Sequence, residues 1–146
     1  MEEKKFGVAT KGFIFKDGKI LTLYKTAEEA SHDPNPELRK DQPGGRTEFG
    51  EDPNKALLRE IYEESGLEVK VIMPLNVWHY VKNNFQLVGI NFLCEWVSGE
   101  VTLSEEHESF EWLTLEEIRS KKWWDEYQYV NAFSVYEKYL VIKNHK

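Results

Sequence analysis

The chain has 146 residues and a hydrophobic fraction of 40%, so we expect one domain, spanning residues 1–146, with a core of its own. No apolar run approaches the roughly 20 residues that cross a bilayer, and the charged first residues lack a signal-peptide stretch, which favours a cytoplasmic protein without a membrane partner. A net charge of −7 without a basic cluster argues against a long nucleic acid as partner, but a small polyphosphate fits if metal ions screen the acidic groups.

The first part of the chain predicts a β-hairpin followed by irregular structure. Residues 6–15 and 19–24 have the composition of strands, and Asp17-Gly18 between them is a typical hairpin turn. The polar segment 26–40 contains two prolines and is predicted to be irregular. It either covers a pocket or forms a simple surface loop. Pro43-Gly44-Gly45 predicts a tight turn.

A helix with clear start and end signals follows this turn. Asp52 fits the N-cap and Pro53 the first helical position, while Gly66 is typical of the residue after a helix end. We therefore predict a helix from about Pro53 to Ser65. The positions expected to face the core are Ala56, Leu57 and Ile61.

The second part of the chain predicts strands first. Residues 67–77 and 85–97 are rich in apolar and β-branched side chains and are joined through the turn at 82–84. An acidic loop at 104–109 precedes a short predicted strand at 110–113. These strands and the first hairpin supply enough elements for one sheet.

Two helices are predicted at the end of the chain. Thr114 and Glu117 form a capping box at the start of a short helix. A final helix is expected over about residues 127–142. Its predicted apolar stripe consists of Val130, Phe133, Tyr136, Tyr139 and Leu140. Strands interspersed with helices, without an internal repeat or a linker, predict an α+β domain.

The most informative residues are three glutamates of the predicted central helix. Glu60, Glu63 and Glu64 are three and four positions apart and therefore share one side of the helix. Their like charges repel, so a solvated face or a bound cation must compensate. Carboxylate oxygens suit Mg²⁺ or Mn²⁺ better than zinc, and the glycines at 44 and 45 allow backbone to approach a metal or a phosphate closely.

The whole spacing resembles the Nudix box: Gly, five residues, Glu, seven residues, Arg-Glu, an aliphatic residue, any residue, Glu-Glu, any residue, Gly and an aliphatic residue. The matching residues are Gly45, Glu51, Arg59, Glu60, Ile61, Glu63, Glu64, Gly66 and Leu67. The chain also resembles the Nudix hydrolase family (MutT-related) in its length and element order. The resemblance implies the family's α/β/α sandwich around a mixed β-sheet.

The resemblance also implies an activity. Nudix hydrolases cleave a pyrophosphate bond in a nucleoside diphosphate linked to another moiety and use Mg²⁺ or Mn²⁺. By the family pattern, Glu60, Glu63 and Glu64 bind the metal, often with the carbonyl of Gly44. One carboxylate, either Glu60 or one from a distant loop, acts as the general base. Arg59 follows Glu51 by eight residues, and it either braces the loop against the helix or meets a phosphate.

The distant carboxylate is expected in the acidic loop before Trp112, where the family has its distal acidic loop. We favour Glu106 as this metal ligand or base, with Glu105 and Glu108 as alternatives. His107 is expected to form structural hydrogen bonds in the loop rather than to act as a base. The loop as a whole also fits a solvated acidic segment.

Residues outside the box give weaker indications of the substrate. Gln42 stands where many relatives have an aliphatic residue before Pro-Gly-Gly, so it either packs poorly or faces the substrate. Several aromatic residues are candidates for stacking on a base or for the core: Trp78, Tyr80, Phe85, Trp123 and Trp124. The substrate itself and the formation of a homodimer are left open by the sequence.

Three functions remain to be distinguished. The first is metal-dependent hydrolysis of a small nucleotide or a nucleoside diphosphate derivative. The second is a Nudix-like nucleotide-binding or regulatory module without turnover, but such relatives usually lose carboxylates of the box and this chain keeps them. The third, processing of capped RNA, would favour a basic surface or an accessory domain.

Overall fold

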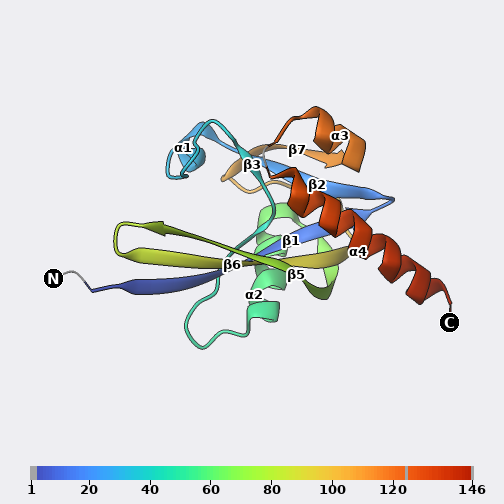
Figure 1. Ribbon diagram of the computed structural model, residues 1–146, viewed down its shortest axis with the longest axis horizontal. Helices are drawn as coiled ribbons and strands as arrows, with labels where there is room; N and C mark the ends of the chain where they lie inside the picture. The colour runs from blue at the N-terminus through green and yellow to red at the C-terminus, as the bar shows by residue number, and fades with distance from the viewer. Residues whose placement is uncertain (1–2, 124, 146) are drawn as a thin grey trace.

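The computed structural model describes residues 3–123 and 125–145 of the chain (Figure 1). Trp124, one of the predicted stacking candidates, lies outside these described residues. In chain order the elements are β1 (Lys5–Lys16), β2 (Lys19–Lys25), α1 (Ala27–Ala30), β3 (Lys40–Asp41), β4 (Gly44–Arg46), α2 (Pro53–Ser65), β5 (Glu68–Lys82), β6 (Phe85–Ser98), β7 (His107–Leu113), α3 (Leu115–Ser120) and α4 (Glu126–Asn144).

The strands form one mixed sheet centred on β1. The strand order is β3-β2-β1-β6-β5, with β4 paired to β1 and β7 paired to β2. The pairing of β1 with β6 is parallel and extends from Lys5 to Phe15, whereas the other pairings are antiparallel. Strand β1 pairs with β2 only at its end and with β4 near its middle. Strands β1 and β2 therefore diverge from their shared turn.

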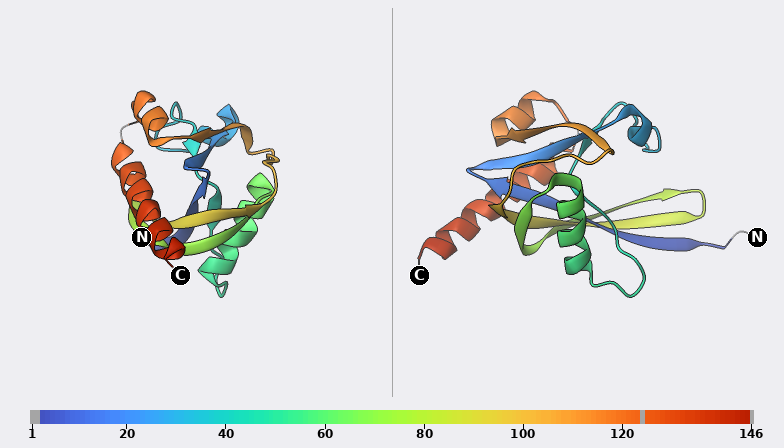
Figure 2. Two further views of the ribbon diagram at one scale, coloured as in Figure 1. Left: turned by 90° about the vertical axis from the view of Figure 1, so that its right-hand side faces the viewer. Right: turned by 180° about the vertical axis from the view of Figure 1, so that it is seen from behind.

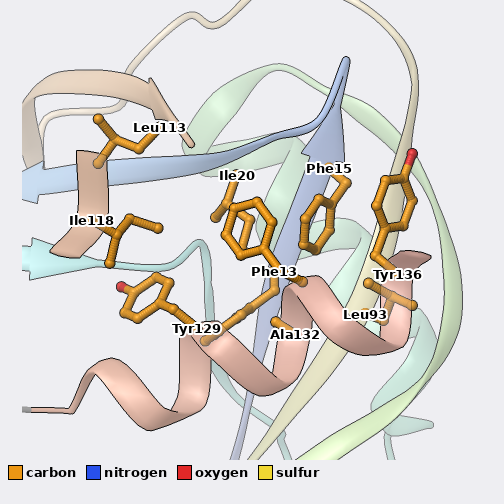
Figure 3. Close-up of a cluster of buried hydrophobic side chains, with 10 residues drawn as sticks. Phe13, Phe15, Ile20, Leu93, Leu113, Ile118, Tyr129, Ala132 and Tyr136 are labelled. Atoms are coloured by element: carbon orange, nitrogen blue, oxygen red, sulfur yellow. The ribbon is translucent and has the colours of Figure 1, made fainter. Parts of the chain in front are cut away.

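Helices cover both faces of the sheet, as the predicted α/β/α sandwich requires. Figure 2 shows α2 and α4 on opposite sides of the strands. Alternate residues of β1 serve the two sides: Phe13 and Phe15 pack toward α4, and Ile14 packs toward α2. The Phe15 ring stacks on Tyr136 of α4 with centroids 4.1 Å apart, in the cluster drawn in Figure 3. The predicted fold class is confirmed.

The far end of the sheet extends beyond both helices. The tip of the β5–β6 hairpin and the start of β1 project away from α2 and α4 as an arm (Figures 1 and 2). One face of this arm, carrying Trp78, Tyr80 and Leu87, lines a cavity described below.

Several boundaries differ from the sequence predictions. The predicted turn at residues 43–45 is wrong, because Gly44–Arg46 forms strand β4 against β1. Strand β5 runs to Lys82 because it pairs with β6 as far as the hairpin turn, and β7 begins at His107 because it pairs with the distant strand β2. The segment 26–40 contains the single-turn helix α1.

The predicted capping boxes and caps are confirmed where the signals are local. Thr114 accepts a hydrogen bond from the Glu117 backbone, and the Glu117 side chain accepts one from the Thr114 backbone. In α4 the buried stripe includes Tyr129 and Ala132, which the prediction omitted, as well as Phe133 and Tyr136.

Within residues 3–123 and 125–145, no helix combines the length and the apolar composition needed to cross a membrane.

Candidate active site

The three glutamates of helix α2 differ in how deeply they are buried. Asp52 accepts a hydrogen bond from the Asn54 backbone at 2.9 Å, and Gly66 closes the helix in the left-handed conformation with φ of 73°. The caps fix the helix register, which turns Leu57 and Ile61 into the core. With that register Glu63 is exposed, Glu60 is half-buried and Glu64 is buried.

Strand β4 lies directly against two of these carboxylates. The Gly44 amide donates a hydrogen bond to Glu64 Oε2 at 3.2 Å, and a β-carbon on Gly45 would lie only 3.0 Å from the Glu60 carboxyl carbon. Gly44 has φ of 148°, and a β-carbon there would lie 2.0 Å from the carbonyl oxygen of Thr10. Glycine is therefore required at 44, and it brings backbone next to the glutamates.

Arg59 connects the loop before α2 to the glutamates. Its Nη2 lies 3.0 Å from Glu51 Oε2, so the expected bracing pair is present. Its Nη1 also lies 3.2 Å from Glu60 and 3.4 Å from Glu63. The hydrogen bond from the Glu48 backbone and those from Arg59 hold the pKa of Glu51 below its usual range. Arg59 thus already has carboxylate partners in this structure.

Burial makes ionisation of the inner glutamates costly. It raises the pKa of Glu64 to about 7, although the Lys11 ammonium and the Gly44 amide oppose the shift. Burial also raises the pKa of Glu60, and the negative charges of Glu63 and Glu106 add to this while Arg59 opposes it. A cation among these side chains would favour their ionised forms.

A second group of titratable side chains lies behind Glu64. The Lys11 ammonium is 3.1 Å from Asp41 Oδ1, and His107 Nε2 is 2.9 Å from Asp41 Oδ2. Ligand atoms of Asp41, Glu64 and His107 all lie within 4.8 Å of one another. Burial alone would raise the pKa of Asp41, but Lys11 and the bond to His107 outweigh it and hold that pKa below its usual range. Lys11 therefore already supplies a positive charge to this group.

Lys11 and Asp41 belong to no motif in the sequence. Lys11 is one polar residue in the sequence of β1. Asp41 belongs to the two-residue strand β3, whose pairing with β2 is a tertiary contact. His107 does form a hydrogen bond as expected, although it is buried rather than in a solvated loop. Local spacing carries no signal for this grouping.

The acidic segment before Trp112 lies near the site, but its members differ. The charge of Glu106 acts on Glu60, whereas the carboxylate of Glu108 is 2.8 Å from Arg39 and is already paired. The Glu106 carbonyl accepts a hydrogen bond from the Thr26 backbone at 3.1 Å, which holds the segment to the end of β2. Glu106 remains the predicted distant carboxylate, and its role stays a prediction.

A cavity of about 630 Å³ opens beside the glutamates. Its wall includes Gly45, which contacts Glu60, and residues of the 26–40 segment, so that segment covers a pocket rather than forming a simple surface loop. The lining residues are Ala9, Lys11, Phe13, Lys25, Asp33, Pro34, Asn35, Leu38, Lys40, Asp41, Gln42, Gly45, Arg46, Trp78, His79, Tyr80, Leu87, Asn91, Asp125, Gln128 and Tyr129.

The predicted substrate-facing residues divide into two groups. Trp78 and Tyr80 line the cavity. Trp123 instead packs near Tyr129, with ring centroids 5.7 Å apart, and Phe85 lies under the Arg46 guanidinium at 4.5 Å. Gln42 is buried in the wall.

The carboxylate set fits a hard divalent cation. Glu60, Glu63 and Glu64 supply oxygen atoms at three depths on one side of α2, and backbone of β4 approaches them without an intervening side chain. Burial raises the pKa of both Glu60 and Glu64, so a bound cation would stabilise their ionised forms. Mg²⁺ and Mn²⁺ match this oxygen-rich chemistry.

Comparisons with known proteins give one answer for the family. The sequence model of the NUDIX domain matches residues 5–133. A MutT-like protein from Streptomyces ambofaciens is 32% identical over 79 residues, which are 54% of this chain and 50% of that protein. The NAD-capped RNA hydrolase NudC from Mannheimia succiniciproducens is 35% identical over 79 residues, or 54% of this chain and 25% of the relative. The matches thus span half or less of these curated relatives.

The fold agrees with that match. The crystal structure of MutT protein from Methanosarcina mazei Go1 superposes with a TM-score of 0.72 at 21% identity, over 100% of both chains. The Nudix box on α2, the sandwich around the mixed sheet and the domain match all lead to one assignment. The chain belongs to the Nudix hydrolase family.

Proposed function

We propose that this Nudix hydrolase cleaves a phosphoanhydride bond of a small nucleoside diphosphate derivative with Mg²⁺, or with Mn²⁺ as a substitute. The observation that carries the proposal is that Glu60, Glu63 and Glu64 lie together on α2 and that Gly45, which contacts Glu60, lines a cavity of about 630 Å³. That volume suits a small-molecule ligand. The relative from Mannheimia succiniciproducens is an NAD-capped RNA hydrolase, and an NAD cap contains a nucleoside diphosphate unit.

The residues have distinct roles in this proposal. Glu60, Glu63 and Glu64 would hold the cation, with the Gly44 carbonyl and Glu106 as further ligands. A cation bound there would neutralise phosphate charge and lower the pKa of the attacking water. Either Glu60 or Glu106 accepts the proton from the attacking water. Both carboxylates act on the same region, since the charge of Glu106 already shifts the pKa of Glu60.

Arg59 acts as a positioning residue. Its guanidinium contacts Glu51, Glu60 and Glu63 simultaneously, so it fixes the orientation of these carboxylates. It also offsets part of the repulsion between Glu60 and Glu63. In this arrangement Arg59 orders the ligands rather than binding the substrate.

The test is a hydrolysis assay over a panel of nucleoside triphosphates, dinucleotides and nucleotide sugars, with separate detection of phosphate and pyrophosphate. Glu63→Gln should abolish turnover with Mg²⁺ while circular dichroism shows a retained fold. Glu137→Gln is the matched control, because Glu137 is an exposed residue of α4. If the wild type binds nucleotides but yields no product with any divalent metal, the chain is a binding module and the proposed function is wrong.

A further inference from the structure

The cavity wall on the arm holds an indole that lies over a glycine. Trp78 of β5 is paired with Gly89 of β6, and their side-chain positions share the face that lines the cavity. A β-carbon on Gly89 would lie 2.0 Å from one indole carbon of Trp78 and 2.1 Å from another. The indole thus occupies the space that any other residue at 89 would need.

Hydrogen bonds fix the indole in this orientation. Trp78 Nε1 donates to Asn91 Oδ1 at 3.0 Å, and Asn91 Nδ2 donates to Asn76 Oδ1 at 2.7 Å. Asn91 is buried, so this amide is held from two sides. The Tyr80 ring is nearly parallel to the indole, with an interplanar angle of 8° and centroids 6.3 Å apart. The aromatic wall is therefore ordered before any ligand binds.

The cavity lined by the indole extends to β4, which lies against Glu60. Trp78 lies on the wall formed by the arm, and Gly45, whose backbone lies against the Glu60 carboxyl group, is on the wall formed by β4. A ligand whose phosphates reach the glutamates can therefore extend along the sheet toward the arm. A planar group at its other end meets an aromatic surface.

We propose that Trp78 is the platform on which the nucleobase of the substrate stacks, with Gly89 and Asn91 as its positioning residues. The inference rests on the proposed function in that the base belongs to the nucleotide being hydrolysed. An aromatic face attracts every base, since each has a π-face, so this wall selects for a nucleotide without selecting strongly among bases.

The buried amides of the wall support recognition by stacking. Asn91 is engaged by Trp78 and Asn76, as described above. Gln42 Nε2 donates to the Leu21 carbonyl at 2.6 Å, and its Oε1 accepts from the Tyr129 hydroxyl at 3.1 Å. Both side chains are thus already hydrogen-bonded within the protein, and the indole beside them gives this part of the cavity an aromatic surface.

The direct test is calorimetric binding of AMP with Mg²⁺. AMP has no phosphoanhydride bond, so its binding is measured without turnover. Trp78→Ala should weaken binding between about fivefold and about 150-fold, the range for loss of one base–aromatic stack. Trp78→Phe keeps a ring and should recover most of the affinity. UMP should bind the wild type within about tenfold of AMP. An AMP affinity that is unchanged in Trp78→Ala, or no AMP binding by the wild type, overturns the inference.

The role of Gly89 has its own control on the same arm. Gly89→Ala should displace the indole and weaken AMP binding, whereas Gly7→Ala should not, because its added β-carbon would meet only the flexible end of the Phe85 ring and a methyl group of Leu87. Quenching of tryptophan fluorescence by AMP should be seen in the wild type and lost in Trp78→Phe. An equal loss of binding in both glycine variants contradicts the positioning role.

Kinetics separate this inference from the proposed function. With a hydrolysed nucleotide, Trp78→Ala should raise KM and leave kcat within about twofold, as expected for an interaction that binds substrate and transition state alike. If the wild type hydrolyses the nucleotide and Trp78→Ala has an unchanged KM, the stacking role of Trp78 is wrong but the proposed hydrolase function stands. If the wild type shows no turnover but its AMP binding depends on Trp78, the stacking role of Trp78 is supported and the proposed hydrolase function is wrong.

Discussion

Glu64 is the residue where burial and charge conflict most strongly. It is buried, it accepts a hydrogen bond from the Gly44 amide, and burial raises its pKa to about 7. In that environment the neutral carboxyl group is favoured, and ionising it without a nearby cation costs free energy because the charge is desolvated. The same property makes it a site where a divalent cation gains affinity as pH rises.

The stability of the metal-free protein should therefore depend on pH through Glu64. Its pKa rises from 4.5 in the unfolded chain to about 7 in the fold, so the folded form binds more protons in between and loses stability as pH increases from about 4.5 to 7. Glu64→Gln removes this titration. In EDTA at pH 8 the variant should be more stable than the wild type by up to about 3 kcal/mol, measured by urea unfolding.

The comparison has two controls. Near pH 3.5 the two proteins should be about equally stable, because Glu64 is then almost fully protonated in both the folded and the unfolded state. Excess Mn²⁺ at pH 8 should stabilise the wild type more than the variant, since ligand binding to the folded state adds to stability. A stability difference independent of pH would contradict the assigned pKa shift.

Glu106 can be separated from its neighbours by one substitution. If it is the base, Glu106→Gln should lower kcat by roughly 10²- to 10⁴-fold with little change in KM. Glu105 is adjacent and exposed, so Glu105→Gln serves as the control and should leave kcat nearly unchanged. An unchanged rate in Glu106→Gln would remove Glu106 from the mechanism and leave Glu60 as the base.

Strand β4 is the element that most constrains the site. Its three residues pair with β1 and lie against α2, which places Gly44 next to Glu64 and Gly45 next to Glu60. The sequence predicted a turn at this position, because glycines next to a proline usually form one. The pairing with β1 is a long-range contact that no local pattern encodes.

Gly44→Ala should strongly destabilise the fold. The added carbon would lie 2.0 Å from the Thr10 carbonyl oxygen at a φ of 148°, so backbone must shift, at a cost of roughly 2–5 kcal/mol. Gly50→Ala is the matched control. Its φ is also positive, at 84°, but the added carbon meets open space, so only about 1–2 kcal/mol is expected. Similar losses of unfolding free energy in both variants would contradict the close fit of β4.

Elements with local signals were predicted well, and those with distant partners were not. Asp52, Pro53 and Gly66 define α2 within the sequence itself, and the structure has the helix at Pro53–Ser65. By contrast, β7 begins at His107 because it pairs with β2 from the start of the chain, a contact that periodicity alone does not reveal. The cavity likewise combines segments that lie far apart in the chain.

At the scale of the whole molecule, the sandwich places chemistry and recognition on different elements. The carboxylates come from α2, whereas the cavity wall comes from the sheet, the arm and the 26–40 segment. The Nudix box identified the first group from sequence because its residues share one helix and the loop before it. The Lys11–Asp41–His107 group escaped prediction because β1, β3 and β7 meet only through the sheet.

The most direct test of the account is the position of manganese in a crystal soaked with Mn²⁺, located by anomalous diffraction. We predict a peak bound by carboxylate oxygens of Glu60, Glu63 and Glu64, at the side of the cavity next to β4. A peak at Asp41 and His107 instead, or no peak at α2 in the presence of a bound nucleotide, would contradict the central claim that this helix gathers the catalytic cation.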